Sequence, residues 1–297
     1  MTKELLLLTS PPASGKTFWI KSLKDIFSTK SFLVISPLRA LADECKENWG
    51  ELISVMTPEE YLGKKGNYDV VIFDEFHLNF YWGDSFRPLM WEVFYEVVEN
   101  SEFTILLTAT LTSEMKAEIE LFRSHFDRML WVNCGNQKLR TLPGSYIKFS
   151  RPDSLLDLIC SEPKNDGVKL IFCAYKNEVH ELTASLKRKG FSVIPCIGGE
   201  SRFMKERLES CPCPDFIVST TVLSHGVNLP VIRKIFFLYK VNNIDFWIQM
   251  VARGGRRGEN FEVFALEKPY LMKWSPLLNL FKRFCLKISR MEFPWLC

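Results

Sequence analysis

The sequence predicts an α/β fold of two parallel-sheet domains, and three observations carry this prediction. Short runs rich in Val, Ile, Leu and Phe recur along the chain, and longer amphipathic stretches separate them. Most of these runs are apolar without alternation, as strands covered on both faces are in parallel sheets. The segment 133–150, with Gly135, Pro143 and Gly144 among polar residues, interrupts the alternation and divides the runs into two series. We therefore expect two doubly wound sheets with a linker between them.

Each expected element follows from this pattern in chain order. The first series of expected strands comprises 4–9, 31–36, 70–74, 103–108 and 130–132. The second series comprises 168–174, 192–197, 215–219, 234–239 and 262–265. The expected helices between the strands are 16–27, 38–49, 86–98, 113–124, 177–189 and 201–210. These elements predict a first domain at 1–135, a linker at 136–150 and a second domain at 151–270.

Residues 271–297 predict a basic amphipathic helix. One stripe of this helix is apolar, and its Lys and Arg residues lie away from that stripe. We favour packing of the helix on the second domain. The alternatives are a basic face beside a nucleic acid and a docking helix for a partner protein.

Composition and charge narrow the class of protein. The 297 residues are 47% hydrophobic and 25% charged, which excludes a disordered or collagen-like chain. The formal net charge is only +3, so any nucleic-acid surface must be a local one. No apolar run reaches the roughly 18 residues that a membrane span needs. Nine cysteines, an odd number, without a recognisable secretory signal lead us to expect reduced thiols and a cytoplasmic location.

The strongest local signal follows the first expected strand. The segment Ser10-Pro-Pro-Ala-Ser-Gly15-Lys16-Thr17 matches the phosphate-loop pattern GxxxxGK[ST], except that Ser10 replaces the first Gly. In such a loop, backbone N–H groups surround the β-phosphate, Lys16 reaches the β- and γ-oxygens, and the Thr17 hydroxyl binds Mg²⁺. The alternative is an ordinary turn before a helix. The candidate ATP-binding residues here are Pro12, Ala13, Ser14, Gly15, Lys16 and Thr17.

An acidic pair follows the third expected strand. Asp74 and Glu75 end a buried apolar run, and an ionised carboxylate at that edge of a sheet is costly unless it faces a cation. We expect Asp74 to hold Mg²⁺ and Glu75 to activate the attacking water. An acidic helix cap is the alternative interpretation.

The second domain carries a glutamine and two arginines at regular spacing. Gln249, Arg253 and Arg256 lie in a helical stretch that runs into glycines, so we expect the two guanidinium groups to project from one face. There they would stabilise charge on the transferring γ-phosphate. The alternative is a solvated basic patch.

In this order the motifs resemble those of the superfamily-two helicases. Motif I is 10–17, motif Ia begins at Ile35, motif Ib is Thr57-Pro58-Glu59, and motif II is the DExH-type Asp74-Glu-Phe-His77. Motif III is Thr108-Ala-Thr110, motif IV is 170–174, motif V is 219–230, and motif VI is 249–256. The wording of motifs Ia, V and VI is closest to the Ski-like RNA helicases and archaeal repair helicases. The resemblance implies two RecA-like domains with ATP between them.

The resemblance also implies roles for matching residues. His77, Thr108 and Thr110 would couple hydrolysis to domain movement, and Gly226 and Asn228 would bind ATP. The implied nucleic-acid contacts are Pro37, Arg39, Thr57, Pro58 and Thr220.

We therefore expect an ATP- and Mg²⁺-dependent helicase or translocase acting on single-stranded RNA or DNA. The alternatives are a nucleic-acid-stimulated ATPase that remodels complexes and an ATP-gated clamp. Because the accessory domains of the Ski-like relatives have no counterpart here, a protein partner would supply them.

An aromatic segment at 79–87 follows motif II. Its rings could stack on bases, but burial against the next helix is the favoured interpretation.

Overall fold

The computed structural model describes residues 2–83, 86–198, 201–224 and 229–267. The described residues form two compact units, which meet in the sequence between Arg140 and Thr141. We call them unit 1 and unit 2 and treat each by itself. Among the described residues, no helix is long and apolar enough to cross a membrane.

Unit 1 contains one six-stranded parallel sheet in the order β3-β2-β4-β5-β1-β6. Its strands are β1 (Glu4–Thr9), β2 (Phe32–Ile35), β3 (Ser54–Met56), β4 (Val70–Phe73), β5 (Phe103–Thr108) and β6 (Arg128–Asn133). Its helices are α1 (Lys16–Ile26), α2 (Arg39–Trp49), α3 (Pro58–Lys64), α4 (His77–Trp82), α5 (Leu89–Asn100), α6 (Ser113–Leu121) and the 3₁₀ helix η1 (Phe122–His125).

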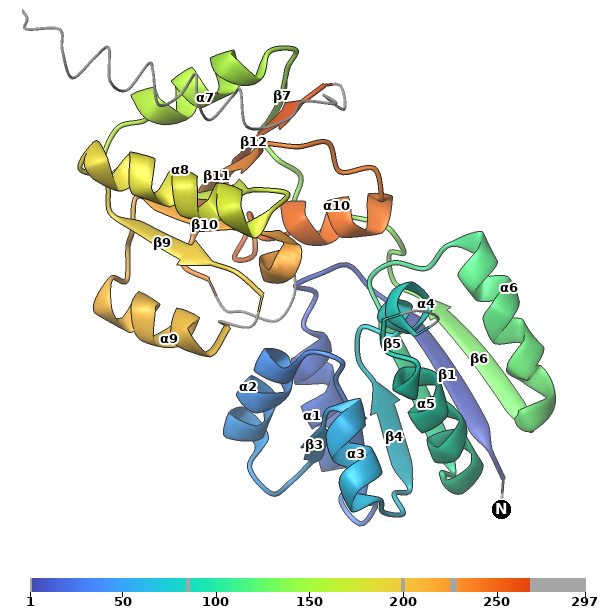
Figure 1. Cartoon of the computed structure of the whole chain (residues 1–297). Helices are drawn as coiled ribbons and strands as arrows, with labels where there is room; N and C mark the ends of the chain where they lie inside the picture. Colours follow the sequence, from blue (N-terminus) through green and yellow to red (C-terminus); the bar gives the residue numbers. More distant parts are fainter. Residues whose placement is uncertain (1, 84–85, 199–200, 225–228, 268–297) are drawn as a thin grey trace, which may run out of the picture. The chain divides into compact units, whose positions relative to one another are not determined.

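Helices cover both faces of this sheet (Figure 1). Side chains of α3, α5 and α6 pack on one face, against residues such as Leu7, Phe73 and Leu106. Side chains of α1 and α2 pack on the other face, against residues such as Val34 and Ile72. Burial on both sides explains why these strands are continuously apolar.

Unit 2 contains a second six-stranded parallel sheet in the order β7-β12-β11-β8-β10-β9. Its strands are β7 (Ser145–Phe149), β8 (Val168–Phe172), β9 (Val193–Cys196), β10 (Phe216–Ser219), β11 (Ile232–Phe237) and β12 (Glu262–Leu266). Its helices are α7 (Pro152–Ser161), α8 (Lys176–Arg188), α9 (Ser201–Ser210), α10 (Ile244–Val251) and the 3₁₀ helix η2 (Thr221–Ser224). Side chains of α7 and α8 pack together on one face of the sheet, where Phe236 and Phe264 stack with ring centroids 4.9 Å apart.

The expected fold of two parallel α/β sheets is confirmed. Strand β3 was not among the expected strands, and two further corrections concern element boundaries. Strand β7 occupies part of the expected linker 136–150 and pairs with β12 along Ser145–Phe149. Its middle residues are exposed because β7 is an edge strand, so the sequence there lacks the apolar run of a buried strand. Helix α10 ends at Val251, so Arg253 and Arg256 follow the helix and do not share a helical face. The expected helix at 271–297 lies outside the described residues.

Candidate active site

The phosphate loop lies between the carboxyl end of β1 and the start of α1. Gly15 has φ +93°, a left-handed conformation that favours glycine, and a Cβ built there would meet nothing within 4 Å. Ala13 also has a positive φ, and the Ser14 N–H closes the turn by donating to the Pro11 carbonyl at 3.3 Å. Within the part of the chain that the structure describes, no hydrogen bond uses the N–H groups of Gly15, Lys16 or Thr17. This open helix start suits an anion.

Three contacts hold the loop in this shape. Ser10, which replaces the usual Gly, donates its N–H to the Thr108 carbonyl at 3.0 Å, and its Oγ lies 2.5 Å from the Ser14 Oγ. Arg140 donates from Nη1 to the Ala13 carbonyl at 2.6 Å. The sequence analysis missed Arg140, because nothing near it in the sequence marks a partner 127 residues away.

Asp74 and Glu75 occupy the turn after β4. The Asp74 N–H donates to the Ile35 carbonyl at 3.0 Å, and the Phe76 N–H donates to the Leu107 carbonyl at 2.9 Å. Glu75 has φ +47°, a strained conformation for a residue with a side chain. Burial and the negative charge of Glu75 raise the pKa of Asp74 to about 7, and the positive charge of Lys16 acts against this shift.

Motifs I, II and III lie at the carboxyl ends of three neighbouring strands. In the sheet, β5 lies between β1 and β4, so the phosphate loop, Thr108 and Asp74 follow the carboxyl ends of adjacent strands. Parallel α/β sheets bind ligands at this edge.

A buried polar contact joins motifs II and III. His77 Nδ1 lies 3.0 Å from Thr108 Oγ1 and 3.5 Å from a carboxylate oxygen of Glu75. The Thr108 hydroxyl donates to the Thr110 carbonyl at 2.7 Å. The structure thus brings together Glu75 and the three expected coupling residues, His77, Thr108 and Thr110.

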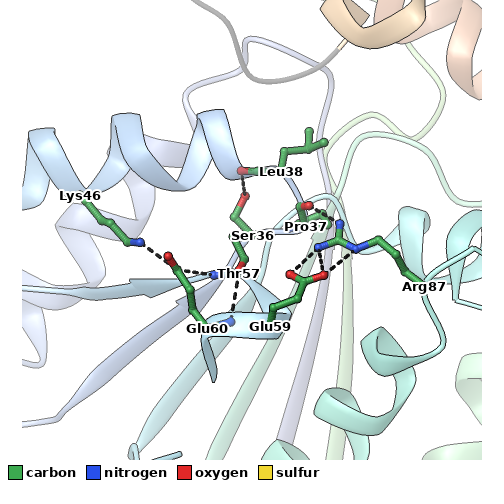
Figure 2. A network of polar contacts seen from close by, with 8 residues as sticks. All are labelled: Ser36, Pro37, Leu38, Lys46, Thr57, Glu59, Glu60 and Arg87. Atoms are coloured by element: carbon green, nitrogen blue, oxygen red, sulfur yellow. Dashed lines mark hydrogen bonds and ion pairs between the residues drawn. The ribbon is translucent and has the colours of Figure 1, made fainter. Parts of the chain in front are cut away.

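Motifs Ia and Ib follow the adjacent strands β2 and β3 (Figure 2). Arg39 begins α2 with an exposed side chain, whereas Pro37 is buried. Thr57 is the buried N-cap of α3, where its hydroxyl accepts from the Glu60 N–H at 3.3 Å, and Pro58 is the first residue of the helix. Of these four expected nucleic-acid contacts, Arg39 therefore offers an exposed side chain, and Thr57 and Pro58 form a helix start.

The expected site residues of unit 2 lie around β10 and α10. Thr220 is half-buried after β10, and Gln249 is buried on α10. Arg253 is buried, and Arg256 is half-buried with its Nε 3.4 Å from the Ala252 carbonyl. Gly226 and Asn228 lie outside the described residues.

Two rings of the aromatic segment after motif II, Phe80 and Tyr81, pack against the core of unit 1. Phe80 and Tyr81 are partly buried against the core, and Phe80 meets Trp91 edge-on at 5.1 Å. Phe86 is 73% exposed. Burial is confirmed for Phe80 and Tyr81.

Comparison with known proteins adds a family context. Residues 150–258 match the family described as "Helicase conserved C-terminal domain". The chain is 23% identical over 282 residues to the ATP-dependent RNA helicase FAL1 of Lodderomyces elongisporus, covering 86% of this chain and 69% of that protein. It is 27% identical over 127 residues to the ATP-dependent RNA helicase DBP3 of Mycosarcoma maydis, covering 41% of this chain and 21% of DBP3. A relative from Acanthamoeba polyphaga mimivirus is matched over 39% of its length. The chain thus spans well under two thirds of the last two proteins.

Solved structures share the fold. Dbp5 of S. cerevisiae bound to RNA and ADP BeF3 superposes with a TM-score of 0.68 at 15% identity, covering 94% of this chain and 83% of Dbp5. Lhr of Mycobacterium smegmatis bound to single-stranded DNA and AMP-PNP superposes with a TM-score of 0.65 at 16% identity, covering 89% of this chain and 44% of Lhr. The chain therefore shares the two-sheet fold of these helicases, and its residues 150–258 match the helicase C-terminal domain family.

Proposed function

We propose that the chain is an ATP-dependent helicase or translocase that acts on a single strand of RNA or DNA. One observation carries the proposal. A phosphate loop with an open helix start and the acidic pair Asp74-Glu75 follow two strands that flank β5 in one sheet, and Thr108 of β5 contacts His77. The helicase names of the relatives agree with this assignment.

The residues of the loop and motif II suit ATP with Mg²⁺. The N–H groups at the start of α1 and the ammonium group of Lys16 match the charge of a triphosphate. A carboxylate whose pKa rises to about 7 through burial and a neighbouring carboxylate favours a cation beside it, so Asp74 and the Thr17 hydroxyl would hold Mg²⁺. The ion, when bound with ATP, would neutralise charge on the phosphates.

Each catalytic residue then has a defined task. Glu75 orients and deprotonates the attacking water, and His77 positions the Glu75 carboxylate from 3.5 Å. We propose that Arg253 and Arg256 would stabilise the charge that develops on the γ-phosphate and that Gln249 would orient the water or the phosphate. These assignments are proposals from residue chemistry and motif position.

The strand would bind where α2 and α3 begin. The exposed Arg39 side chain supplies a phosphate contact, and Thr220 would supply another in unit 2. Pro37, Thr57 and Pro58 would contribute their backbone and shape.

We place the chain with the DExH group on the basis of His77. Motif II reads Asp-Glu-Phe-His, and the imidazole of His77 is what contacts Thr108 of motif III. We also propose a relationship to the Ski-like helicases, because the residues of motifs Ia, V and VI resemble theirs.

The test is ATP hydrolysis with and without nucleic acid. ATPase rates should rise with single-stranded RNA or DNA more than with blunt duplex, and a duplex with a single-stranded tail should be unwound. Affinity for the strand should fall with salt at a log–log slope of about −0.7 per phosphate contacted. Stimulation without unwinding would favour a remodelling ATPase that needs a protein partner. ATP hydrolysis indifferent to every strand would overturn the proposal.

A further inference from the structure

The Arg87 side chain donates hydrogen bonds to two partners that no motif assigns to it (Figure 2). Its Nε lies 3.0 Å from Glu59 Oε1, and its Nη2 lies 2.7 Å from each Glu59 oxygen. Its Nη1 donates to the Pro37 carbonyl. One planar guanidinium group thus donates hydrogen bonds to a carboxylate and to a backbone carbonyl at the same time. The ammonium group of a lysine would fit this pair of acceptors poorly.

The two partners belong to the two loops proposed to touch the strand. Pro37 lies two residues before Arg39, in the turn after β2, and Glu59 is in the first turn of α3. These strands are neighbours, with Ile35 opposite Met56. The guanidinium of Arg87 therefore fixes the spacing between the starts of α2 and α3.

The backbone at Arg87 is tied to the helix that follows motif II. The Arg87 N–H donates to the Trp82 carbonyl at the end of α4, at 2.6 Å. Asn79 on α4 donates its side-chain amide to the Met90 carbonyl on α5 at 3.3 Å. Short α4 connects this region directly to Glu75 and His77. Arg87 accordingly stands between motif II and the loops of motifs Ia and Ib.

Charge gives the contact a second consequence. Glu59 and Glu60 both lie in the first turn of α3, where two carboxylates would repel a phosphate backbone. Lys46 pairs with Glu60 at 2.8 Å, and Arg87 pairs with Glu59 at 2.7 Å. Burial of Glu59 opposes its ionisation, yet the hydrogen bonds and charge of Arg87 lower the pKa of Glu59 overall. Both carboxylates are therefore neutralised by cations from other segments of unit 1.

We infer that Arg87 is a positioning residue for nucleic-acid binding, which sets the motif Ia turn and the start of α3 in register and links both to motif II. This inference rests on the proposed function, because the strand-binding role of the two loops does. Arg87 itself contacts neither ATP nor the strand in this scheme.

The experiment measures how strand concentration stimulates ATP hydrolysis by the full chain. The variants are Arg87→Ala, Arg87→Lys, Glu59→Gln and the double variant Arg87→Ala with Glu59→Gln. We expect Arg87→Ala to raise the half-saturating concentration of poly(U) or poly(dT), whichever stimulates the wild type, about tenfold, with the rate at saturating strand much less affected. Arg87→Lys should raise the half-saturating concentration several-fold, because a lysine can satisfy one partner at a time.

A matched control lies at the other end of the same sheet. Lys30 also joins two segments of unit 1, with its Nζ 2.6 Å from Glu102 and 3.5 Å from Asp69. Lys30→Ala removes a comparable cation from a region with no proposed strand contact. Its half-saturating concentration should equal that of the wild type, and thermal melting of every variant reports folding separately.

The outcomes separate the two proposals. A wild type that no strand stimulates would overturn the proposed function, and the inference with it. If a strand stimulates the wild type, and Arg87→Ala and Arg87→Lys have the half-saturating concentration of the wild type, the inference alone is overturned. It is also overturned if Lys30→Ala raises the half-saturating concentration as much as Arg87→Ala does. Full recovery in the double variant would show that Arg87 only neutralises Glu59 and positions nothing. A double variant as weak as Arg87→Ala supports positioning.

Discussion

Ser31 and Asp69 in unit 1 make the same three hydrogen bonds as Ser192 and Asp215 in unit 2. Each aspartate accepts from the backbone N–H of its serine, at 2.7 and 2.8 Å, and from the serine hydroxyl, at 2.8 Å in both units. Each aspartate N–H also donates back to the serine Oγ, at 2.9 and 2.8 Å. Each serine precedes a strand, β2 or β9, and each aspartate precedes its neighbour, β4 or β10.

The carboxyl ends of the same strands carry different chemistry. In unit 1, β4 leads into Asp74 and Glu75, with Glu75 at φ +47°. In unit 2, β10 leads into Thr220 and the 3₁₀ helix η2. The two sheets therefore share a framework at the amino ends of their strands, where backbone pairing is secured. They differ at the carboxyl ends, where parallel sheets place ligands.

The substitution with the largest expected effect on this comparison is Glu75→Gln. The amide keeps the size of the side chain and leaves Asp74 and the loop intact, but it cannot take a proton from water. We expect ATP turnover to fall about 10³-fold while ATP affinity stays within a few-fold. Steady-state hydrolysis and binding of a fluorescent ATP analogue measure the two quantities.

The control for Glu75→Gln lies at the amino end of β5. Glu102→Gln removes a carboxylate that pairs with Lys30, at the end of the sheet that we regard as framework. Its turnover should match the wild type. A Glu75→Gln variant that hydrolyses ATP normally would refute the assignment of the carboxyl ends as catalytic.

A smaller effect should come from Arg256→Lys in unit 2. Lysine keeps the charge and loses the planar fork that fits phosphate oxygens, so we expect turnover to drop about 10- to 100-fold with little change in ATP affinity. Arg257→Lys is the matched control, because Arg257 is the next residue and its side chain is exposed. Equal losses in both variants would favour a basic patch over a catalytic arginine.

Much of the fold was predictable because buried parallel strands leave a strong signal. Runs such as 32–35 and 70–73 are apolar throughout, since helices cover both faces of the sheet. Strand β7 was not predicted, because an edge strand with exposed residues lacks this signal. Helices α3 and α4 were also missed: with seven and six residues, they are too short for helical periodicity to appear.

The site was predictable where its residues are consecutive in the sequence. The loop at 10–17 and the pair Asp74-Glu75 are local patterns, and the sheet order then brings them to β1 and β4, the two strands that flank β5. Arg87 and Arg140 act through partners 28 to 127 residues away, and no local pattern marks such a pairing. Thr57 shows the reverse, since its motif position suggested a ligand contact while its hydroxyl caps a helix.

The smallest expected effects concern the shared serine–aspartate pairs. In unit 2, Asp215 is buried, and its second oxygen accepts from the Asn165 N–H at 2.6 Å. Burial opposes ionisation of Asp215, but hydrogen bonds from Asn165 and Ser192 lower its pKa overall. Asp215→Asn would turn an amide N–H₂ toward one of these donors, so we expect a loss of about 2 kcal/mol in the free energy of unfolding at pH 7.

In unit 1, the Asp69 side chain is 33% exposed, and hydrogen bonds from Ser31 lower its pKa. The amide N–H₂ there would face the Lys30 ammonium, which lies 3.5 Å from Asp69 Oδ1 and is exposed enough to move into water, so Asp69→Asn should cost less than Asp215→Asn.

The pH dependence of unfolding tests the same pairs without further substitutions. A carboxyl group whose pKa is lowered by folding stabilises the folded state above its ordinary pKa of 3.8, and this contribution disappears as the pH falls through the lower folded value. The difference between wild type and Asp215→Asn in urea denaturation should therefore be full at pH 7 and shrink below about pH 4. The Asp69→Asn difference should shrink over the same range from a smaller starting value. A Glu75→Gln variant, whose residue belongs to the other end of the sheet, should show no such loss of stability at pH 7. If Asp69→Asn abolished ATP turnover while leaving the urea midpoint unchanged, the division between framework and catalytic ends would be wrong for unit 1.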